Sequence, residues 1–221
     1  MSEPTTTIAE PNAQAPAPED AARAGFYALL ARLCSEGPDA ALLAAIASAA
    51  PLPPAAGESG VADAPVGHDL ASAWNALRAA SLAIDEATAR QEYDDLFVGV
   101  GKSEVNLHAS HWLTGFMMEK PLADVREALA DLGLARRHGT SMVEDHVAAL
   151  CETMRILVAG QGKRPAAEFG VQKMFFDAHI APWVFLCCDA ILDCSLAHYY
   201  RHAAQFAKVF LALERDSFAM D

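Results

Sequence analysis

Apolar residues recur at intervals of three and four along most of the chain, the spacing that places side chains on one face of an α-helix. The first such stripe begins near Asp20 and predicts a helix that ends near Gly37-Pro38. Another stripe follows Asp69, which is placed to cap a helix, and extends as far as Phe97. The same spacing predicts helices over residues 40–49, 108–119, 121–132, 141–158, 166–180, 182–196 and 198–218. Because no period-two alternation bounded by hairpin turns occurs, the predicted fold class is all-α, a single helical bundle.

Two stretches of the chain lack this spacing. Residues 1–22 contain mainly Pro, Ala, Thr and Glu, which bury too little apolar surface to repay the entropy lost on ordering. Residues 51–67 are rich in proline and glycine, which is typical of a surface loop. We therefore expect a disordered tail over residues 1–22 and one helical domain over residues 23–221.

Composition and charge narrow the possible partners. The chain has 221 residues, of which 53% are hydrophobic, so it can bury a large core. Its formal net charge of −13 repels the phosphates of nucleic acids and anionic lipids, whereas a basic peptide is attracted. The first twenty residues carry acid and no apolar core of a secretory signal, and no apolar run is long enough to cross a bilayer. We expect a cytoplasmic protein with no nucleic-acid partner and no stable membrane insertion.

Motifs for catalysis, metals and nucleotides are absent from the sequence. Lys102 and Ser103 follow Gly99-Val100-Gly101, but the spacing is not that of a phosphate-binding loop and a helix, not a strand, precedes it. No Glu has a His three residues later, as a two-metal helical bundle requires. The five cysteines form no C-x-x-C pair and are expected to be reduced core residues. The sequence therefore predicts no catalytic residue, no metal site and no cofactor, and leaves open whether a guanine nucleotide binds.

A candidate helix start lies at Ser141, where Ser141 and Glu144 have the spacing of a capping box. With residues placed at 100° steps from this start, Asp145 falls opposite the apolar side and His146 at its border. We therefore expect Asp145 to face solvent and His146 to reach a neighbouring groove. Considered alone, Asp145 would favour the helix N-terminus and His146 would pack on a neighbour. His179, near two phenylalanines, is expected to be a core residue.

Several segments, taken in order, resemble the successive motifs of the TorD/DmsD/NarJ-type redox-enzyme maturation chaperones. These segments are Glu92-Tyr93-x-x-Leu96-Phe97-x-Gly99, Ser110-His111-Trp112-Leu113, Glu144-Asp145-His146, His179-x-x-Pro182-Trp183 and Tyr199-Tyr200. The resemblance covers roughly residues 25–215. Its specificity comes from the order and spacing of the whole series, since no single motif decides it.

The resemblance implies an all-helical, cytoplasmic protein that is not an enzyme. Members of the family bind the twin-arginine signal peptide, or another segment, of a molybdenum-cofactor oxidoreductase and hold it back from export until the cofactor is inserted. Carried over to this chain, the implied peptide-binding residues are Leu96, Phe97, Trp112, Leu113, Glu144, Asp145 and His146. Carboxylates beside an apolar groove would suit two guanidinium groups followed by an apolar helix. We therefore expect Phe97 and Asp145 to border one acidic, apolar recess.

The sequence departs from the family pattern at three places. Val100 replaces the proline of Gly-Pro-Gly, His108-Ala109 replaces a proline pair, and Met142-Val143 stands where the family has Glu-Pro. These departures indicate a divergent branch, for which a formate dehydrogenase is one candidate client. Alternatives are a helical metal- or nucleotide-using enzyme, and a chaperone of the same fold for a membrane-anchored or non-exported enzyme. The protein is expected to be a monomer or a domain-swapped dimer.

Overall fold

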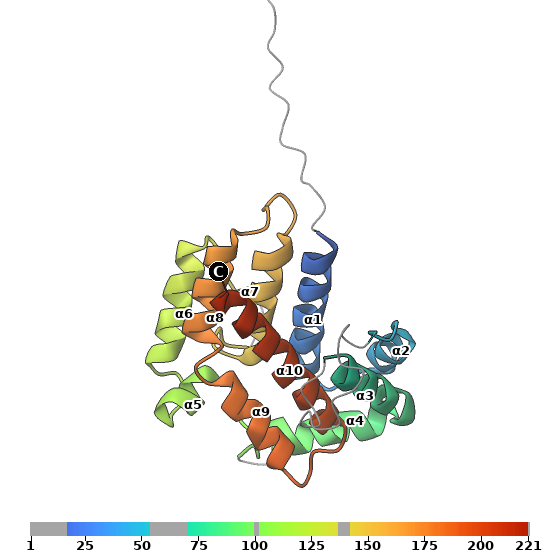
Figure 1. The fold of residues 1–221 in the computed structure, drawn as a ribbon. Coiled ribbons are helices and arrows are strands. Elements are labelled where there is room, and N and C mark those ends of the chain that lie inside the picture. The colour runs from blue at the N-terminus through green and yellow to red at the C-terminus, as the bar shows by residue number, and fades with distance from the viewer. Residues whose placement is uncertain (1–16, 54–69, 100–101, 137–141, 221) are drawn as a thin grey trace, which may run out of the picture.

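A computed structural model describes residues 17–53, 70–99, 102–136 and 142–220, and these residues are helical throughout most of their length (Figure 1). The described residues contain ten α-helices and one π-helical segment, with two isolated β-bridges and no strand. The elements are α1 (Pro18–Ser35), α2 (Ala40–Ser48), α3 (Leu70–Ala83), α4 (Glu86–Tyr93), η1 (Asp94–Val98), α5 (Ala109–Thr114), α6 (Lys120–Asp131), α7 (Val147–Ala159), α8 (Phe169–His179), α9 (Val184–Asp193) and α10 (Tyr199–Ala219). The predicted all-α fold class is confirmed.

Local sequence explains several of the observed helix ends. Asp39 caps α2 by accepting a hydrogen bond from the Leu42 amide, 2.7 Å away. Asp85 caps α4 in the same way through the Thr88 amide, 2.9 Å away. Pro121 lies in the first turn of α6, where a missing N–H costs nothing. The predicted helix over residues 70–97 is therefore wrong in one respect: the Asp85 cap divides it into α3 and α4.

Other predicted boundaries also differ from the structure. The first helix begins at Pro18 instead of Asp20, and the helix expected from 166 begins at Phe169. The helix expected over 108–119 ends at Thr114, because Gly115 adopts a left-handed conformation with φ of 81°. Most of the predicted tail, most of the loop at 51–67, the cap at Asp69, Val100 and Ser141 lie outside the described residues.

The hydrophobic core lies between α1, α7 and α10, with α3, α8 and α9 packed around them (Figure 1). A cluster of aromatic rings joins α1, α3 and α10 through Phe26, Trp74, Phe206 and Phe210, with centroids 5.0–6.3 Å apart. Such offset and edge contacts add to the stabilisation from burial. The core places the C-terminal end of α1 and the N-terminal end of α10 beside η1.

Buried polar groups satisfy the helix ends at this junction. The Glu92 carboxylate accepts hydrogen bonds from the amides of His198, Tyr199 and Tyr200, at 2.8–2.9 Å, and so caps α10 from α4. The Tyr200 hydroxyl donates to the Leu33 carbonyl at the end of α1, 2.9 Å away. Because unpaired backbone groups at buried helix ends are costly, these contacts fix η1 and its neighbours in position.

Candidate peptide-binding site

The segment before α5 lies antiparallel to the segment before α7. The Ala109 amide donates to the Asp145 carbonyl at 3.0 Å, and the Val147 amide donates to the Leu107 carbonyl at 2.8 Å. This pairing forms a β-bridge between His108 and His146. It brings two of the predicted peptide-binding segments, 112–113 and 144–146, to one region of the molecule.

Asp145 is fully buried, with 0% of its surface exposed. Its Oδ2 accepts hydrogen bonds from the Ser110 hydroxyl at 2.6 Å and the Ser110 amide at 3.0 Å, so it caps α5 from another part of the chain. Its Oδ1 has no hydrogen-bond partner among the described residues. The prediction that Asp145 faces solvent is wrong, because α7 begins at Val147 and a helical wheel drawn from Ser141 does not apply.

His146 is the N-cap of α7, since its Nδ1 accepts a hydrogen bond from the Ala148 amide at 3.1 Å. Its ring meets the His108 ring edge to face, with centroids 4.7 Å apart. Burial, and to a lesser extent His108, lower the pKa of His146 to about 3. Burial also lowers the pKa of His108, although Asp145 acts in the opposite direction. Both imidazoles are therefore neutral near neutral pH.

Trp112 is half-buried, and its indole N–H donates to the Asn106 carbonyl at 2.7 Å. The Asn106 side chain accepts a hydrogen bond from the His108 amide at 2.9 Å, which closes a tight turn ahead of α5. Leu113, the next residue, is exposed. These contacts hold the Trp112 ring at the surface of the same turn that the two histidines border.

The two predicted residues of η1 differ in burial. Leu96 is fully buried, whereas Phe97 is half-buried and packs edge to face on Tyr93 and Tyr200. Phe97 lines a small apolar cavity of about 40 Å³ together with Leu107 and Val147. Asp145 is not among the lining residues, so this cavity is apolar and not the acidic recess expected to contain both Phe97 and Asp145.

Glu144 already has cationic partners. Its carboxylate pairs with Arg126 at 3.0 Å and with Arg136 at 3.8 Å, and only 13% of its side chain is exposed. Asp94 and Asp95, by contrast, are exposed at the end of α4 and in η1. The acidic side chains of this region therefore differ: those at η1 are exposed, and Glu144 is ion-paired.

A second and larger cavity, of about 210 Å³, lies where α5 and α6 meet α8. Leu113, Pro121, Val125 and His179 line it, together with the Asp124 carboxylate. The expectation that His179 is a core residue is correct only in part, since it is half-buried. Its ring packs on Phe175 with centroids 4.9 Å apart, and burial lowers its pKa.

A family model described as the nitrate reductase delta subunit matches residues 63–189, more than half of the chain. The chain belongs to this family. It is the NarJ/TorD-type family of molybdoenzyme maturation chaperones, so the resemblance predicted from the ordered motifs is confirmed. No curated protein matches the chain.

The family match includes all seven predicted peptide-binding residues but excludes α1, α2 and α10. Two side chains that organise this region were not among the predicted site residues: Ser110, which links Asp145 to α5, and Asn106, which forms the turn under Trp112. The signal for Asn106 was its turn-forming side chain two residues before a helix start. Ser110 opens the motif Ser110-His111-Trp112-Leu113, but nothing local indicated its hydrogen bond to Asp145, because that partner is 35 residues away.

Within residues 17–53, 70–99, 102–136 and 142–220, no group of three or more His, Cys, Asp or Glu side chains is arranged to hold a metal ion. In the same residues no single helix has the length and apolar character needed to cross a bilayer. Within the same residues, α8 and α9 reach that length and apolar character only together, across a bend of 55° at their junction.

Proposed function

We propose that this NarJ/TorD-type chaperone binds the signal peptide, or another segment, of a molybdenum-cofactor oxidoreductase and holds it for cofactor insertion before export. The observation that carries the proposal is the family match, which spans every residue of the predicted peptide-binding set. Exposed carboxylates at Asp94 and Asp95, close in sequence to the aromatic Phe97, support a ligand that is both cationic and apolar.

The seven residues divide into two proposed roles. Phe97, Trp112 and Leu113 retain accessible surface and are proposed to contact the peptide directly. Leu96, Asp145 and His146 are buried, so they position the helix starts that present those contacts. Glu144 would contribute by exchanging its arginine partners for arginines of the client.

The proposed client is an apoenzyme whose signal peptide carries paired arginines, with a formate dehydrogenase as one candidate. The proposed location is the cytoplasm, where cofactor insertion precedes export, and the proposed form is a monomer or a domain-swapped dimer. No catalytic activity is included in the proposal, in keeping with the chaperone family to which the chain belongs.

Co-purification of the tagged protein from the cytosol of its own host tests this function. We expect the bound fraction to contain the catalytic subunit of one molybdoenzyme in its cofactor-free form, identified by mass spectrometry and metal analysis. Deleting the gene should abolish that enzyme's activity while leaving total molybdenum cofactor unchanged. Normal molybdoenzyme activities in the deletion strain would contradict the proposal.

A truncated client separates the two kinds of chaperone. If the signal peptide is recognised, client without its signal sequence should no longer be retained. Equal retention of full-length and truncated client would instead indicate a chaperone for a membrane-anchored or non-exported enzyme. Stoichiometric iron, zinc or manganese in the purified protein would favour the enzyme alternative.

A further inference from the structure

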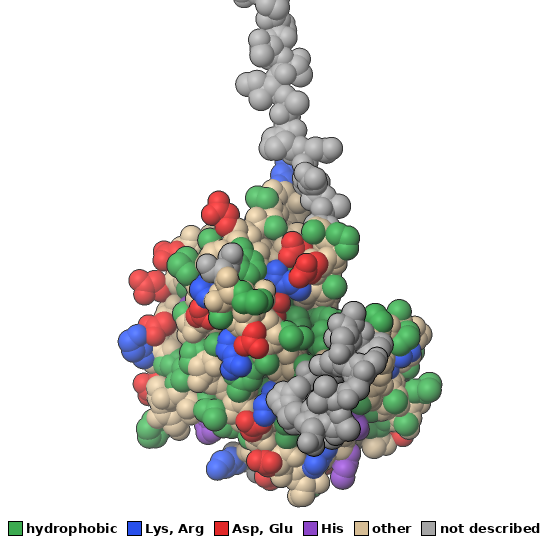
Figure 2. Space-filling view, viewed as in Figure 1, with side chains coloured by type: hydrophobic (Ala, Val, Ile, Leu, Met, Phe, Trp, Pro, Cys, Tyr) green, Lys and Arg blue, Asp and Glu red, His purple; other side chains and the backbone are tan. Residues whose placement is uncertain are grey.

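The end of α5 and the connection to α6 expose four large apolar side chains, Leu113, Phe116, Met117 and Met118. Residues 113–118 are called the apolar turn below. Phe116 and Met118 are 70% and 71% exposed. Elsewhere in the described residues, the large apolar side chains that are exposed stand singly along the sequence. Single exposed residues are ordinary, whereas a contiguous exposed group indicates an interaction surface. Figure 2 shows hydrophobic side chains on the surface at the lower left, the region of α5 in Figure 1.

The apolar turn is held in place by polar contacts beneath it. The Glu119 amide donates to the Ser110 hydroxyl at 3.3 Å, and the Phe116 amide donates to the Thr114 hydroxyl at 3.2 Å. Met118 adopts φ of 60°, and it is the single non-glycine residue with a positive φ in the described chain. A strained backbone persists only where its surroundings impose it. The turn is therefore a preformed surface that directs apolar side chains outward.

This surface continues into the larger cavity. Leu113 belongs to the apolar turn and also lines the cavity of about 210 Å³, whose walls include Val125 and the carboxylate of Asp124. Among the described residues, the Asp124 carboxylate forms an ion pair with the ammonium of Lys120 alone, and the Lys120 side chain is 80% exposed. An exposed ion pair such as that between Lys120 and Asp124 contributes little to stability, so the planar guanidinium of an arginine could replace the lysine.

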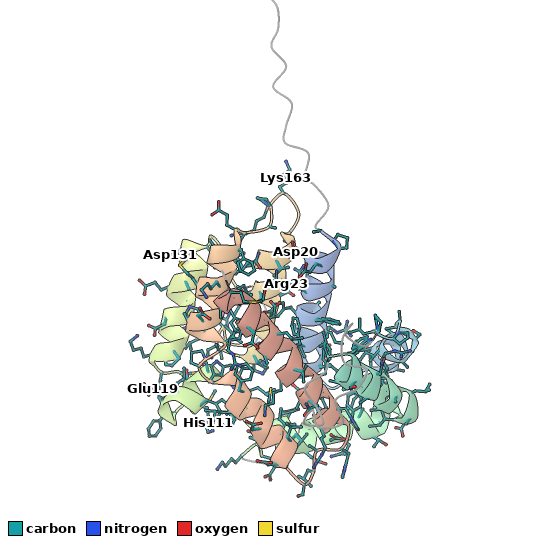
Figure 3. All side chains as sticks on the ribbon, viewed as in Figure 1. Asp20, Arg23, His111, Glu119, Asp131 and Lys163 are labelled. Carbon is teal, nitrogen blue, oxygen red and sulfur yellow. The ribbon has the colours of Figure 1, made fainter. Side chains whose placement is uncertain are left out.

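Acidic side chains flank the apolar turn and α6, alongside two cations of α6 that are ion-paired, Lys120 and Arg126. Glu119 follows the turn as the N-cap residue of α6, where Figure 3 labels it at the lower left, and Glu127 lies on α6. Neither carboxylate makes an ion pair with a described residue. With the formal net charge of −13, this region repels a second copy of the chain and an anionic lipid surface, and it attracts a cationic polypeptide.

We propose that the apolar turn and the adjoining cavity form the docking surface for an apolar, helix-forming segment of the client that carries an arginine beside its apolar face. This inference rests on the proposed function and assigns the contacts made by that function. Phe116 and Met118 pack on the apolar face of the segment, and Asp124 accepts hydrogen bonds from its arginine. Methionine side chains adapt to irregular partners, which suits a surface that must hold a client and release it.

The buried Asp145 acts on this surface as a positioning residue. Its Oδ2 accepts the Ser110 hydroxyl hydrogen bond at 2.6 Å, and the same hydroxyl accepts the Glu119 amide at the end of the apolar turn. Asp145 therefore fixes the rotamer of Ser110, and Ser110 fixes the turn. Asp145, which the sequence predicted as a site residue, therefore affects client binding through Ser110 and the turn, without touching the client.

Fluorescence anisotropy with a labelled synthetic peptide tests the docking surface. The peptide carries two adjacent arginines followed by a leucine- and alanine-rich helix-forming stretch, and a second peptide has glutamine in place of both arginines. For the full-length protein, Phe116→Ser combined with Met118→Ser should weaken binding of the first peptide about tenfold or more. Leu82→Ser is the matched control, because Leu82 is 79% exposed on α3, and it should change binding less than about twofold.

Asp124→Asn examines the arginine contact separately. The substitution should weaken binding of the arginine peptide severalfold and leave binding of the glutamine peptide unchanged, since only a guanidinium forms an ion pair with the carboxylate. Thermal unfolding of each variant should match that of Leu82→Ser, because all four positions are on the surface.

Three outcomes would overturn the inference, and they differ in whether they also contradict the proposed function. Unchanged binding of the arginine peptide to Phe116→Ser/Met118→Ser would remove the docking surface and leave the proposed function intact. No binding of either peptide to the wild-type protein would remove both the docking surface and signal-peptide recognition. A wild-type dimer that dissociates on the same double substitution, with peptide affinity unaltered, would identify the apolar turn as a contact between copies of the chain.

Discussion

Two buried carboxylates in this protein cap helices that lie far away in the sequence. Glu92 accepts three amides at the start of α10, and Asp145 accepts the amide and hydroxyl of Ser110 in the first turn of α5. Neither α5 nor α10 receives a cap from the side chain at its own N-cap position. A buried carboxylate at a helix N-terminus gains both hydrogen bonds and a favourable dipole. Substituting Asp145 is therefore expected to lower stability as well as any binding.

The N-cap role of His146 leads to a prediction about pH. Its pKa in the folded protein is about 3, below the ordinary value of 6.5, so the unfolded chain binds the additional proton between these values. Stability from the neutral imidazole is present above about pH 6.5 and decreases as pH falls, by at most about 1.4 kcal/mol per pH unit. His146→Asn keeps a capping side chain but cannot titrate. Urea unfolding at about pH 7 and about pH 5 should show a smaller loss for His146→Asn than for wild type; equal losses would contradict this assignment.

At the scale of elements, α5 and the apolar turn form one short unit whose geometry depends on side-chain hydrogen bonds, including those with Asp145. Gly115 ends α5 with φ of 81°, and Met118 needs a positive φ before α6 can begin. The side-chain contacts of Ser110 and Thr114 determine this path. A six-residue helix has little stability of its own, so its geometry depends on these contacts.

Met118→Gly measures the strain stored in the apolar turn. A non-glycine residue in the left-handed region costs about 1–2 kcal/mol, whereas glycine costs about 0.5–1 kcal/mol in chain entropy. We therefore expect Met118→Gly to raise the free energy of unfolding by about 0.5 kcal/mol. Met117→Gly is the control, because Met117 has no positive φ, and it should lower stability by about 0.5–1 kcal/mol. Chemical denaturation that finds both variants equally destabilised would show that Met118 is not strained.

At the scale of the whole molecule, a packed apolar core carries an acidic surface. Inside the bundle, the half-buried Arg23 of α1 pairs with the buried Glu214 of α10 at 2.7 Å. The charge of Glu214 is thus compensated, and most of the other acidic side chains lie at the surface. A net charge of −13 acts over a distance of about 10 Å at ordinary ionic strength, so it affects the encounter with a partner more than the final complex.

Salt should accordingly slow the association with a cationic client. In stopped-flow mixing of the protein with the arginine peptide, the association rate constant should fall about tenfold as sodium chloride is raised from about 0.02 to 0.5 M. The dissociation rate constant should change much less, because Phe116, Met118 and the apolar contacts determine it. An association rate constant that is independent of salt would contradict the prediction that the net charge speeds the encounter.

Hydrophobic spacing was sufficient to predict where most helices lie, since the apolar face of each helix is encoded within a few turns of chain. Leu30 and Leu33, three residues apart on the first helix, are both buried in the core. The ordered motifs were likewise sufficient to indicate the family. Spacing failed at the start of α7, where a local capping signal at Ser141 and Glu144 competes with the backbone pairing of Val147 and Leu107.

The sequence by itself determined the helical class, the acidic character and the family of this protein, because these properties follow from local spacing, from composition and from the order of short motifs. Only the tertiary structure decided that Asp145 is buried under α5, that Glu92 caps α10, and that the apolar turn is exposed. The first two depend on a partner tens of residues away, and the burial or exposure of any side chain is determined by what packs over it.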